Sequence, residues 1–223
     1  MAAERRSGLR VASNAAAVVL VLISGGFAPA VGPTPAEPDW SALAREVAEE
    51  TNRLRRDPSS YAPYLEAMLP RFDGFVLERP GRPFLRTEEG EPAVVEAIAA
   101  LRAARPAPPL QWSAGLARAA SDHVRDQGPI GGTEHSGTDG SDPARRMERY
   151  GQWRGAVAEN IAYGENPARD VVLQLVIDDG VPGRGHREAL LESDWGISGV
   201  ACGRHRDYGQ ICVMDYAVGY EER

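Results

Sequence analysis

A predicted β-hairpin near the C-terminus constrains the fold more than any other feature of this sequence. Its two apolar runs cover residues 197–202 and 210–218, and turn-forming residues around Asp207 separate them. In a hairpin centred on Asp207, Cys202 and Cys212 lie directly opposite each other, because each is five positions from the centre. Opposite residues at a non-hydrogen-bonded site come within reach of a disulfide. The sequence therefore predicts a cross-strand disulfide, with two reduced core cysteines as the alternative.

The N-terminus has the pattern of a secretory signal peptide. Arg5, Arg6 and Arg10 supply positive charge, and the apolar run over residues 11–24 is too short for a comfortable membrane span. Residues 28–30 then read Ala-Pro-Ala, which is typical of a cleavage site. An uncleaved N-terminal anchor is the alternative to this interpretation.

The domain organisation follows from that leader. We expect a signal peptide over residues 1–30, a flexible proline-containing leader over 31–39 and one domain over 40–223. The protein is then secreted, with the periplasm or cell envelope as alternative locations, and has no stable membrane insertion after cleavage. An oxidising location favours the disulfide. The formal net charge of -7 argues against a nucleic-acid partner, because phosphate binding needs a basic surface.

Apolar residues recur at helical spacing along much of the chain. Helices are predicted over residues 40–56, from Pro58, and over 87–105, 113–127, 143–150 and 168–177. Their predicted N-terminal caps are Ser41, Asp57, Thr87, Ser113 and Asp142. Residues 72–86 contain two glycines and two prolines without a sustained period, so a loop is predicted there; residues 156–163 are a predicted strand.

Histidines and carboxylates occur together in turn-rich segments. Glu159 lies in the predicted strand, and the adjacent Asp178 and Asp179 precede a Gly/Pro-rich turn that leads to His186. His135 lies upstream in a predicted loop. Two neutral imidazoles can bind a divalent ion, and carboxylates can orient them or complete the coordination. These residues are candidates for one polar site.

Each candidate also has a purely structural interpretation. His135 is then a solvated loop histidine, and His186 is a helix-start histidine bonded to backbone. Glu159 would pair with an arginine such as Arg184 or Arg187, and either aspartate would cap the turn at Gly180. Of the remaining histidines, we expect His123 in the core or at its rim and His205 exposed near the hairpin tip.

In their order along the chain, several segments resemble the CAP superfamily, also called the SCP domain. This superfamily includes cysteine-rich secretory proteins, venom antigen 5 and plant pathogenesis-related proteins of class one, and the resemblance is strongest to its bacterial secreted branch. It covers about residues 40–220. The segments that carry it are Asn52-Arg53-Leu54-Arg55 before Asp57-Pro58, Leu110-Gln111-Trp112, the His135 loop, Glu159-Asn160-Ile161-Ala162 and Gly185-His186-Arg187.

The resemblance implies an α+β fold, an α-β-α sandwich with a short antiparallel sheet between helical layers. It also implies a cleft formed by His135, Glu159, Asp178 and His186. The family usually has a glutamate at the position of Asp178, on a helix after a tryptophan that is Leu175 here. Because Asp178 is one methylene shorter, Asp179 remains an alternative for this position.

Three functions are compatible with such a cleft. The first is a secreted binding module, in which His135 and His186 bind a divalent metal, Zn²⁺ foremost, and a small hydrophobic ligand such as a lipid or an extracellular partner binds nearby. The second is a metal-assisted hydrolase or protease with Glu159 as base. The third is a structural extracellular or cell-wall domain. The chain has no G-x-S-x-G, H-E-x-x-H or C-x-x-C motif, so whether it is an enzyme stays open.

Overall fold

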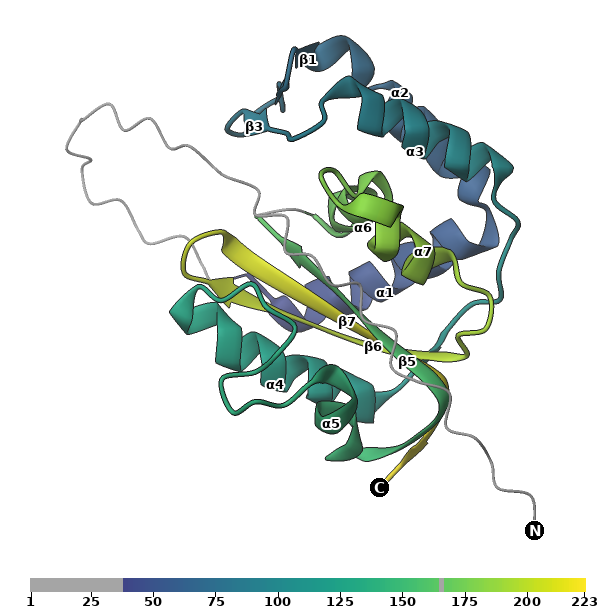
Figure 1. Cartoon of the computed structure of the whole chain (residues 1–223), viewed down its shortest axis with the longest axis vertical. Helices are drawn as coiled ribbons and strands as arrows, with labels where there is room; N and C mark the ends of the chain where they lie inside the picture. The colour runs from purple at the N-terminus through teal and green to yellow at the C-terminus, as the bar shows by residue number, and fades with distance from the viewer. Residues whose placement is uncertain (1–37, 165–166) are drawn as a thin grey trace, which may run out of the picture.

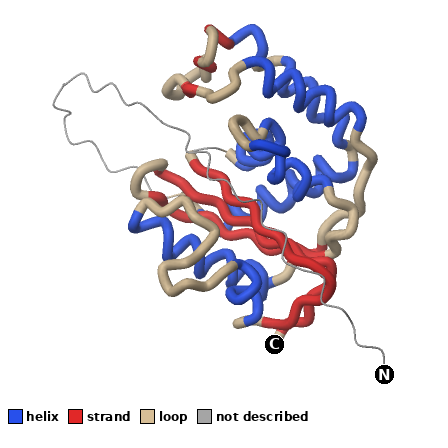
Figure 2. Tube along the Cα trace, viewed as in Figure 1, coloured by secondary structure: helices blue, strands red, loops and turns tan. Residues whose placement is uncertain are grey.

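The computed structural model describes residues 38–164 and 167–223, in which a β-sheet lies between two layers of helices (Figure 1). The predicted signal peptide and most of the predicted leader lie outside the described residues. Figure 2 shows the same layering, with the strands of the sheet between helices on either side. The predicted α+β sandwich is confirmed. Among the described helices, none has the length and apolar character needed to cross a membrane.

The central sheet contains four strands in the order β4 (Gln111–Trp112), β6 (Ile197–His205), β7 (Gly209–Glu222) and β5 (Gly151–Tyr163). The three long strands are antiparallel, and the short edge strand β4 runs parallel to β6. The predicted hairpin register is confirmed, since Cys202 faces Cys212 and the two form a disulfide.

Helices α4 (Ala114–Ile130) and α5 (Pro143–Glu148) cover one face of the sheet (Figure 1). Ser113 and Asp142 cap them as predicted, because their side chains accept hydrogen bonds from backbone N–H groups of the first turn. The predicted end of α4 near Gln127 was wrong. Gly128 does not stop the helix: an added Cβ there would lie 2.3 Å from the carbonyl oxygen of Arg204, so this glycine permits close packing of α4 against β6.

Helices α1 (Trp40–Arg56), α6 (Ala168–Ile177) and α7 (Gly185–Leu191) pack on the opposite face. The helix predicted over residues 40–56 is confirmed, but its cap is Asp39 rather than Ser41. The Asp39 carboxylate accepts hydrogen bonds from the backbone N–H groups of Ser41 and Ala42. The largest core cluster lies between this layer and the sheet, and it includes the disulfide.

Beyond α6, an outer group of short elements and α3 (Glu91–Ala103) packs on this second layer. The cap predicted at Thr87 was wrong: the Thr87 hydroxyl donates to the carbonyl of Phe75, and Gly90 precedes α3 instead. The segment predicted as a loop contains a small antiparallel sheet of three two-residue strands. The short elements of this group are η1 (Pro58–Tyr61), α2 (Ala62–Glu66), η2 (Leu69–Arg71), β1 (Phe72–Asp73), β2 (Val76–Leu77) and β3 (Leu85–Arg86). A further short helix, η3 (Pro182–Arg184), leads from α6 into α7.

Candidate functional site

The first half of the candidate site is a buried cluster around Glu159 on β5. Oε1 of Glu159 lies 2.8 Å from Nδ1 of His135, and Oε2 accepts a hydrogen bond of 2.6 Å from Nη2 of Arg146. Glu159 is 1% exposed, so both of its oxygens are engaged beneath the surface. Glu159 does pair with an arginine, as its structural interpretation expects, but the partner is Arg146. The suggested partners Arg184 and Arg187 were wrong, because both bind Glu96.

The arginine beside Glu159 was missed because nothing in the sequence distinguishes Arg146 from its neighbour Arg145. Arg146 is buried on α5, whereas Arg145 is exposed. Nη1 of Arg146 also donates to the carbonyl oxygens of His135 and Ser141, each at 3.0 Å. One guanidinium group therefore binds both the carboxylate that contacts His135 and the backbone carbonyl of His135.

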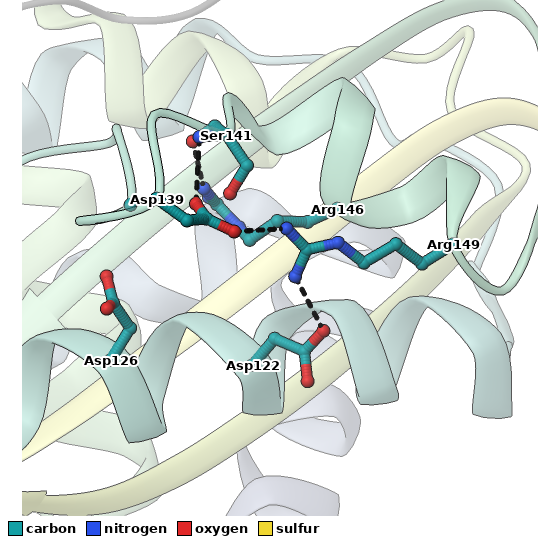
Figure 3. Close-up of a pocket in the computed structure, with 7 residues that line it drawn as sticks. Asp122, Asp126, Asp139, Ser141, Arg146 and Arg149 are labelled. Atoms are coloured by element: carbon teal, nitrogen blue, oxygen red, sulfur yellow. Dashed lines mark hydrogen bonds and ion pairs between the residues drawn. The ribbon is translucent and has the colours of Figure 1, made fainter.

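The loop that carries His135 continues to Asp139, and Arg149 connects this residue to Asp122 on α4 (Figure 3). Asp126 on α4 accepts a hydrogen bond from the backbone N–H of Thr138 at 2.8 Å. Asp139 accepts an ion-pair hydrogen bond of 2.6 Å from Arg149, which also contacts Asp122 on α4. These contacts position the loop backbone, and hence His135, without contributing to the chemistry at the imidazole.

The second half of the site is the pair formed by Asp178 and His186. Asp178 ends α6 in the left-handed conformation, with φ of 55°. Its Oδ1 lies 2.6 Å from Nδ1 of His186, and its Oδ2 accepts the backbone N–H of His186 at 2.9 Å. Asp179 points elsewhere and accepts the backbone N–H groups of Glu88 and Glu89. The aspartate that contacts the histidine in this structure is therefore Asp178.

Both histidines line one cavity of about 450 Å³. The side chains of His135 and His186 are 18% and 12% exposed. Each ring has its Nδ1 against a carboxylate, which favours the tautomer that leaves Nε2 as the lone-pair nitrogen. The structure thus brings His135, Asp178 and His186 to the cavity wall, while Glu159 lies behind His135.

The two imidazoles on the cavity wall are candidate donors for a metal ion with an open coordination shell. Within residues 38–164 and 167–223, no group of three or more histidine, cysteine, aspartate or glutamate side chains is placed to hold a metal. An ion in the cavity would therefore have at most the two imidazoles from this part of the chain, with water completing its shell. Such a site is weaker than a four-ligand structural zinc site.

The other two histidines lie outside the cavity wall. His123 on α4 is buried, as expected, with Nε2 2.8 Å from the carbonyl oxygen of Glu134, and burial lowers its pKa. The expectation that His205 is exposed was wrong, since it is 1% exposed. Its Nδ1 accepts the backbone N–H groups of Asp207 and Tyr208, and its Nε2 contacts the carbonyl of Gly132. A histidine at a tight hairpin tip is thus part of the turn.

A buried acid next to Glu159 was also missed. Asp215 on β7 lies directly opposite Glu159 and is fully buried, and neither of its oxygens accepts a hydrogen bond in the described structure. Burial and the nearby Glu159 charge raise the pKa of Asp215 well above its usual range. For Glu159, burial opposes ionisation, but the hydrogen bond to His135 and the charge of Arg146 hold its pKa below the usual value. The two pKa values are shifted in opposite directions, so Glu159 is the member of the pair that ionises first as pH rises.

A comparison with protein-family models shows the family of this chain. The family model described as the cysteine-rich secretory protein family, CAP, matches residues 95–216, which is more than half of the chain. The chain belongs to this family. The matched region contains His135, Glu159, Asp178 and His186. A search of the curated proteins found none that matches this CAP chain.

Two solved structures resemble parts of this CAP chain. One is an outer surface protein from Borrelia burgdorferi, with a TM-score of 0.42 and 22% identity, over 51% of this chain and 78% of that one. The other is an extracellular protein containing a SCP domain from Bacillus anthracis, with a TM-score of 0.39 and 21% identity. That match covers 56% of this chain and 38% of the other.

Proposed function

We propose that this CAP protein is a binding module whose cavity holds a weakly bound divalent metal ion and a small apolar ligand. The observation that carries the proposal is the pair of imidazoles on one cavity wall, each oriented through Nδ1 by a buried carboxylate. Each carboxylate fixes the orientation and the tautomer of its ring, so that Nε2 is left to bind an ion. Neutral imidazole suits Zn²⁺ and similar ions.

The lining of the cavity supports an apolar ligand beside the metal. Its volume of about 450 Å³ lies within the range of about 300–1,000 Å³ that is usual for small-molecule sites. Apolar side chains from the small sheet, α3, β5 and α6 form most of the wall. They include Phe72, Leu77, Leu85, Val94, Ile161, Leu173, Leu175 and Ile177.

A hydrolase that uses Glu159 as base receives less support from this geometry. A general base needs hydrogen-bond reach to the proton that it abstracts. Glu159 is buried, and its two oxygens are engaged by His135 and Arg146. His135 is the group of this pair that reaches the cavity, so a catalytic role would fall to it instead.

We further propose that the protein acts outside the cytoplasm. The predicted signal peptide and the disulfide between Cys202 and Cys212 support this location. N-terminal sequencing of exported protein should give Val31 as the first residue. A mature chain that starts at Met1 or Ala2 would contradict cleavage after Ala30.

Native mass spectrometry of the protein secreted by its own host tests the proposed function. We expect a retained divalent metal, a retained apolar small molecule, or both, and their loss on denaturation. A parallel sample that is treated with a chelator separates the metal from the organic ligand. If protein from several growth conditions carries neither and takes up neither on incubation, the chain is a structural domain instead.

A further inference from the structure

We propose that the outer surface of the small sheet docks this protein reversibly on a lipid bilayer that contains anionic lipids. This surface, here named the small-sheet surface, consists of Arg71, Phe75, Phe84 and Arg86. Its two phenylalanine rings enter the bilayer interface, and its two arginines contact anionic head groups. Because the inference concerns the outside of the domain, it goes beyond the proposed function and requires no ligand in the cavity.

Exposed phenylalanines are the first observation behind this inference. All the phenylalanines of the described residues lie between residues 72 and 84. Phe84 is 66% exposed and Phe75 is 54% exposed, and no other large apolar residue of the described chain is as exposed as either. Single exposed apolar residues are normal on a soluble protein, but two exposed rings on one short segment indicate a surface that contacts an apolar partner.

The two exposed rings are separate from the cavity. The register of the small sheet places Phe72, Leu77 and Leu85 side by side, and all three line the cavity. Phe75 lies in the turn between β1 and β2, and Phe84 directly precedes β3. Neither is among the described residues that line the cavity, so a ligand bound there would leave both rings exposed.

The charge around the two rings favours an anionic partner. Residues 71–86 contain four arginines and two acids, on a chain whose formal net charge is -7. Arg82 pairs with Asp170, whereas Arg71 and Arg86 are exposed and have no ion pair with a described residue. An anionic membrane repels an acidic protein as a whole, but it attracts a segment in which arginines outnumber acids. The small-sheet surface is therefore the part of this domain that would face such a membrane.

The position of the small sheet in the fold leaves this surface accessible. Figure 1 shows β1 and β3 at the end of the molecule that lies opposite the C-terminus. Hydrogen bonds order the turns that carry the rings. The backbone N–H and the hydroxyl of Thr87 both donate to the carbonyl of Phe75, and Nε of Arg79 donates to the carbonyl of Pro83, next to Phe84. Rings that are held on ordered turns lose little conformational freedom on docking.

A bilayer suits this surface better than a folded protein partner does. The two rings come from different turns, and charged residues lie between them in the sequence. At a bilayer interface, phenylalanine rings enter the boundary between head groups and acyl chains, while arginines remain at the head groups. A folded partner would instead need two pockets that match the spacing of the rings.

Vesicle flotation of the exported protein without its signal peptide tests the role of the rings. One set of vesicles contains phosphatidylcholine alone, and the other contains equal parts of phosphatidylcholine and phosphatidylglycerol. A double variant with Phe75→Ser and Phe84→Ser removes both rings. The matched control carries Ile130→Ser and Val218→Ser, which change two exposed apolar residues on α4 and β7.

A second pair of variants tests the role of the arginines. One protein carries Arg71→Gln and Arg86→Gln, and its control carries Arg56→Gln and Arg105→Gln, which change two exposed arginines outside the small sheet. Thermal midpoints confirm that all four variants fold.

We expect the wild type and both controls to bind the anionic vesicles about tenfold or more tightly than the neutral vesicles, and added salt to weaken this binding. Loss of the two rings should weaken binding to the anionic vesicles about tenfold or more, because less apolar surface enters the interface. Loss of the two arginines should weaken it about tenfold or more as well, because each contributes about fivefold near an anionic surface.

The inference is overturned if the wild type binds neither kind of vesicle or binds both equally. Unchanged vesicle binding by the ring variant or by the arginine variant also overturns it. If the wild type self-associates in sedimentation experiments without vesicles, and loss of the rings abolishes this, the surface is a contact between copies of the chain instead of a membrane surface. None of these outcomes affects the proposed metal and apolar ligands, because the two phenylalanines do not line the cavity.

Discussion

Replacing Arg146 with methionine should strongly destabilise this domain. The side chain is 1% exposed and donates to Glu159, to the carbonyl of His135 and to the carbonyl of Ser141. Methionine retains much of the apolar stem but leaves the Glu159 carboxylate buried without a counterion. Removing one partner of a buried ion pair costs about 3–5 kcal/mol. For a domain of this size, that loss lowers the melting temperature by about 6–20 °C.

Arg149, three residues after Arg146, provides an internal control for the size of this loss of stability. Arg149 forms ion pairs with Asp122 and Asp139, but its side chain is 40% exposed. Exposed pairs contribute about 0–1 kcal/mol, so Arg149→Met should change the free energy of unfolding by about 1 kcal/mol at most. Urea denaturation of both variants at neutral pH gives the comparison. Equal losses in the two variants would contradict the role assigned to Arg146.

The pH dependence of the Arg146→Met effect tests its cause. In the wild type the pKa of Glu159 is below its usual value, so its stabilising contribution is present at neutral pH and disappears as pH falls through the folded-state pKa. Without Arg146, protonation of Glu159 relieves the uncompensated charge. The difference in free energy of unfolding between Arg146→Met and the wild type should therefore become smaller as pH falls toward about 4. A difference that does not change with pH would refute the electrostatic explanation.

Two further predictions concern the sheet. Breaking the disulfide with Cys202→Ser and Cys212→Ser should lower the free energy of unfolding by about 2–3 kcal/mol, because the short closed loop no longer restricts the unfolded chain. Chemical denaturation measures this loss. Mass mapping that finds two free thiols in secreted protein would contradict the bond. Asp215→Asn should stabilise the protein at neutral pH by about 1 kcal/mol or more. The raised pKa of Asp215 means that its contribution to stability falls as pH rises from the unfolded-state value toward the folded-state value, and asparagine cannot ionise. This gain in stability should vanish in acid. An Asp215→Asn protein that is less stable than wild type at neutral pH would contradict the raised pKa of Asp215.

The sequence was most informative where structure is local. The register of β6 and β7 follows from the positions of two cysteines around one turn, and the caps of α4 and α5 follow from Ser113 and Asp142. Thr87 has a side-chain oxygen that could cap a helix, as those of Ser113 and Asp142 do, but its hydroxyl donates a tertiary hydrogen bond to the carbonyl oxygen of Phe75 instead. Gly128 resembled a helix stop, yet its role depends on the distance between α4 and β6.

The candidate site depended on contacts that sequence spacing does not show. The resemblance to the family gave the four cleft positions, and the structure places His135 against Glu159 and His186 against Asp178. Arg146 and Asp215 were not found, because their importance arises only when the strand and α5 come together. An aspartate within the apolar run of β7 was a usable signal, since a buried acid requires a partner or a shifted pKa.

Zn²⁺ titration by calorimetry tests most directly whether His135 and His186 form one weak divalent-metal site. The comparison uses the wild type, His135→Ala, His186→Ala and the control Asp207→Asn, which changes a cavity-lining carboxylate that pairs with Arg206. We predict that either histidine variant loses most of the Zn²⁺ affinity while remaining folded, and that Asp207→Asn retains this affinity. Zn²⁺ binding by the wild type should weaken as pH falls, because protonated imidazole cannot ligate. Equal binding by all four proteins, or none by the wild type at about millimolar metal, would contradict the account and leave both histidines with a structural role.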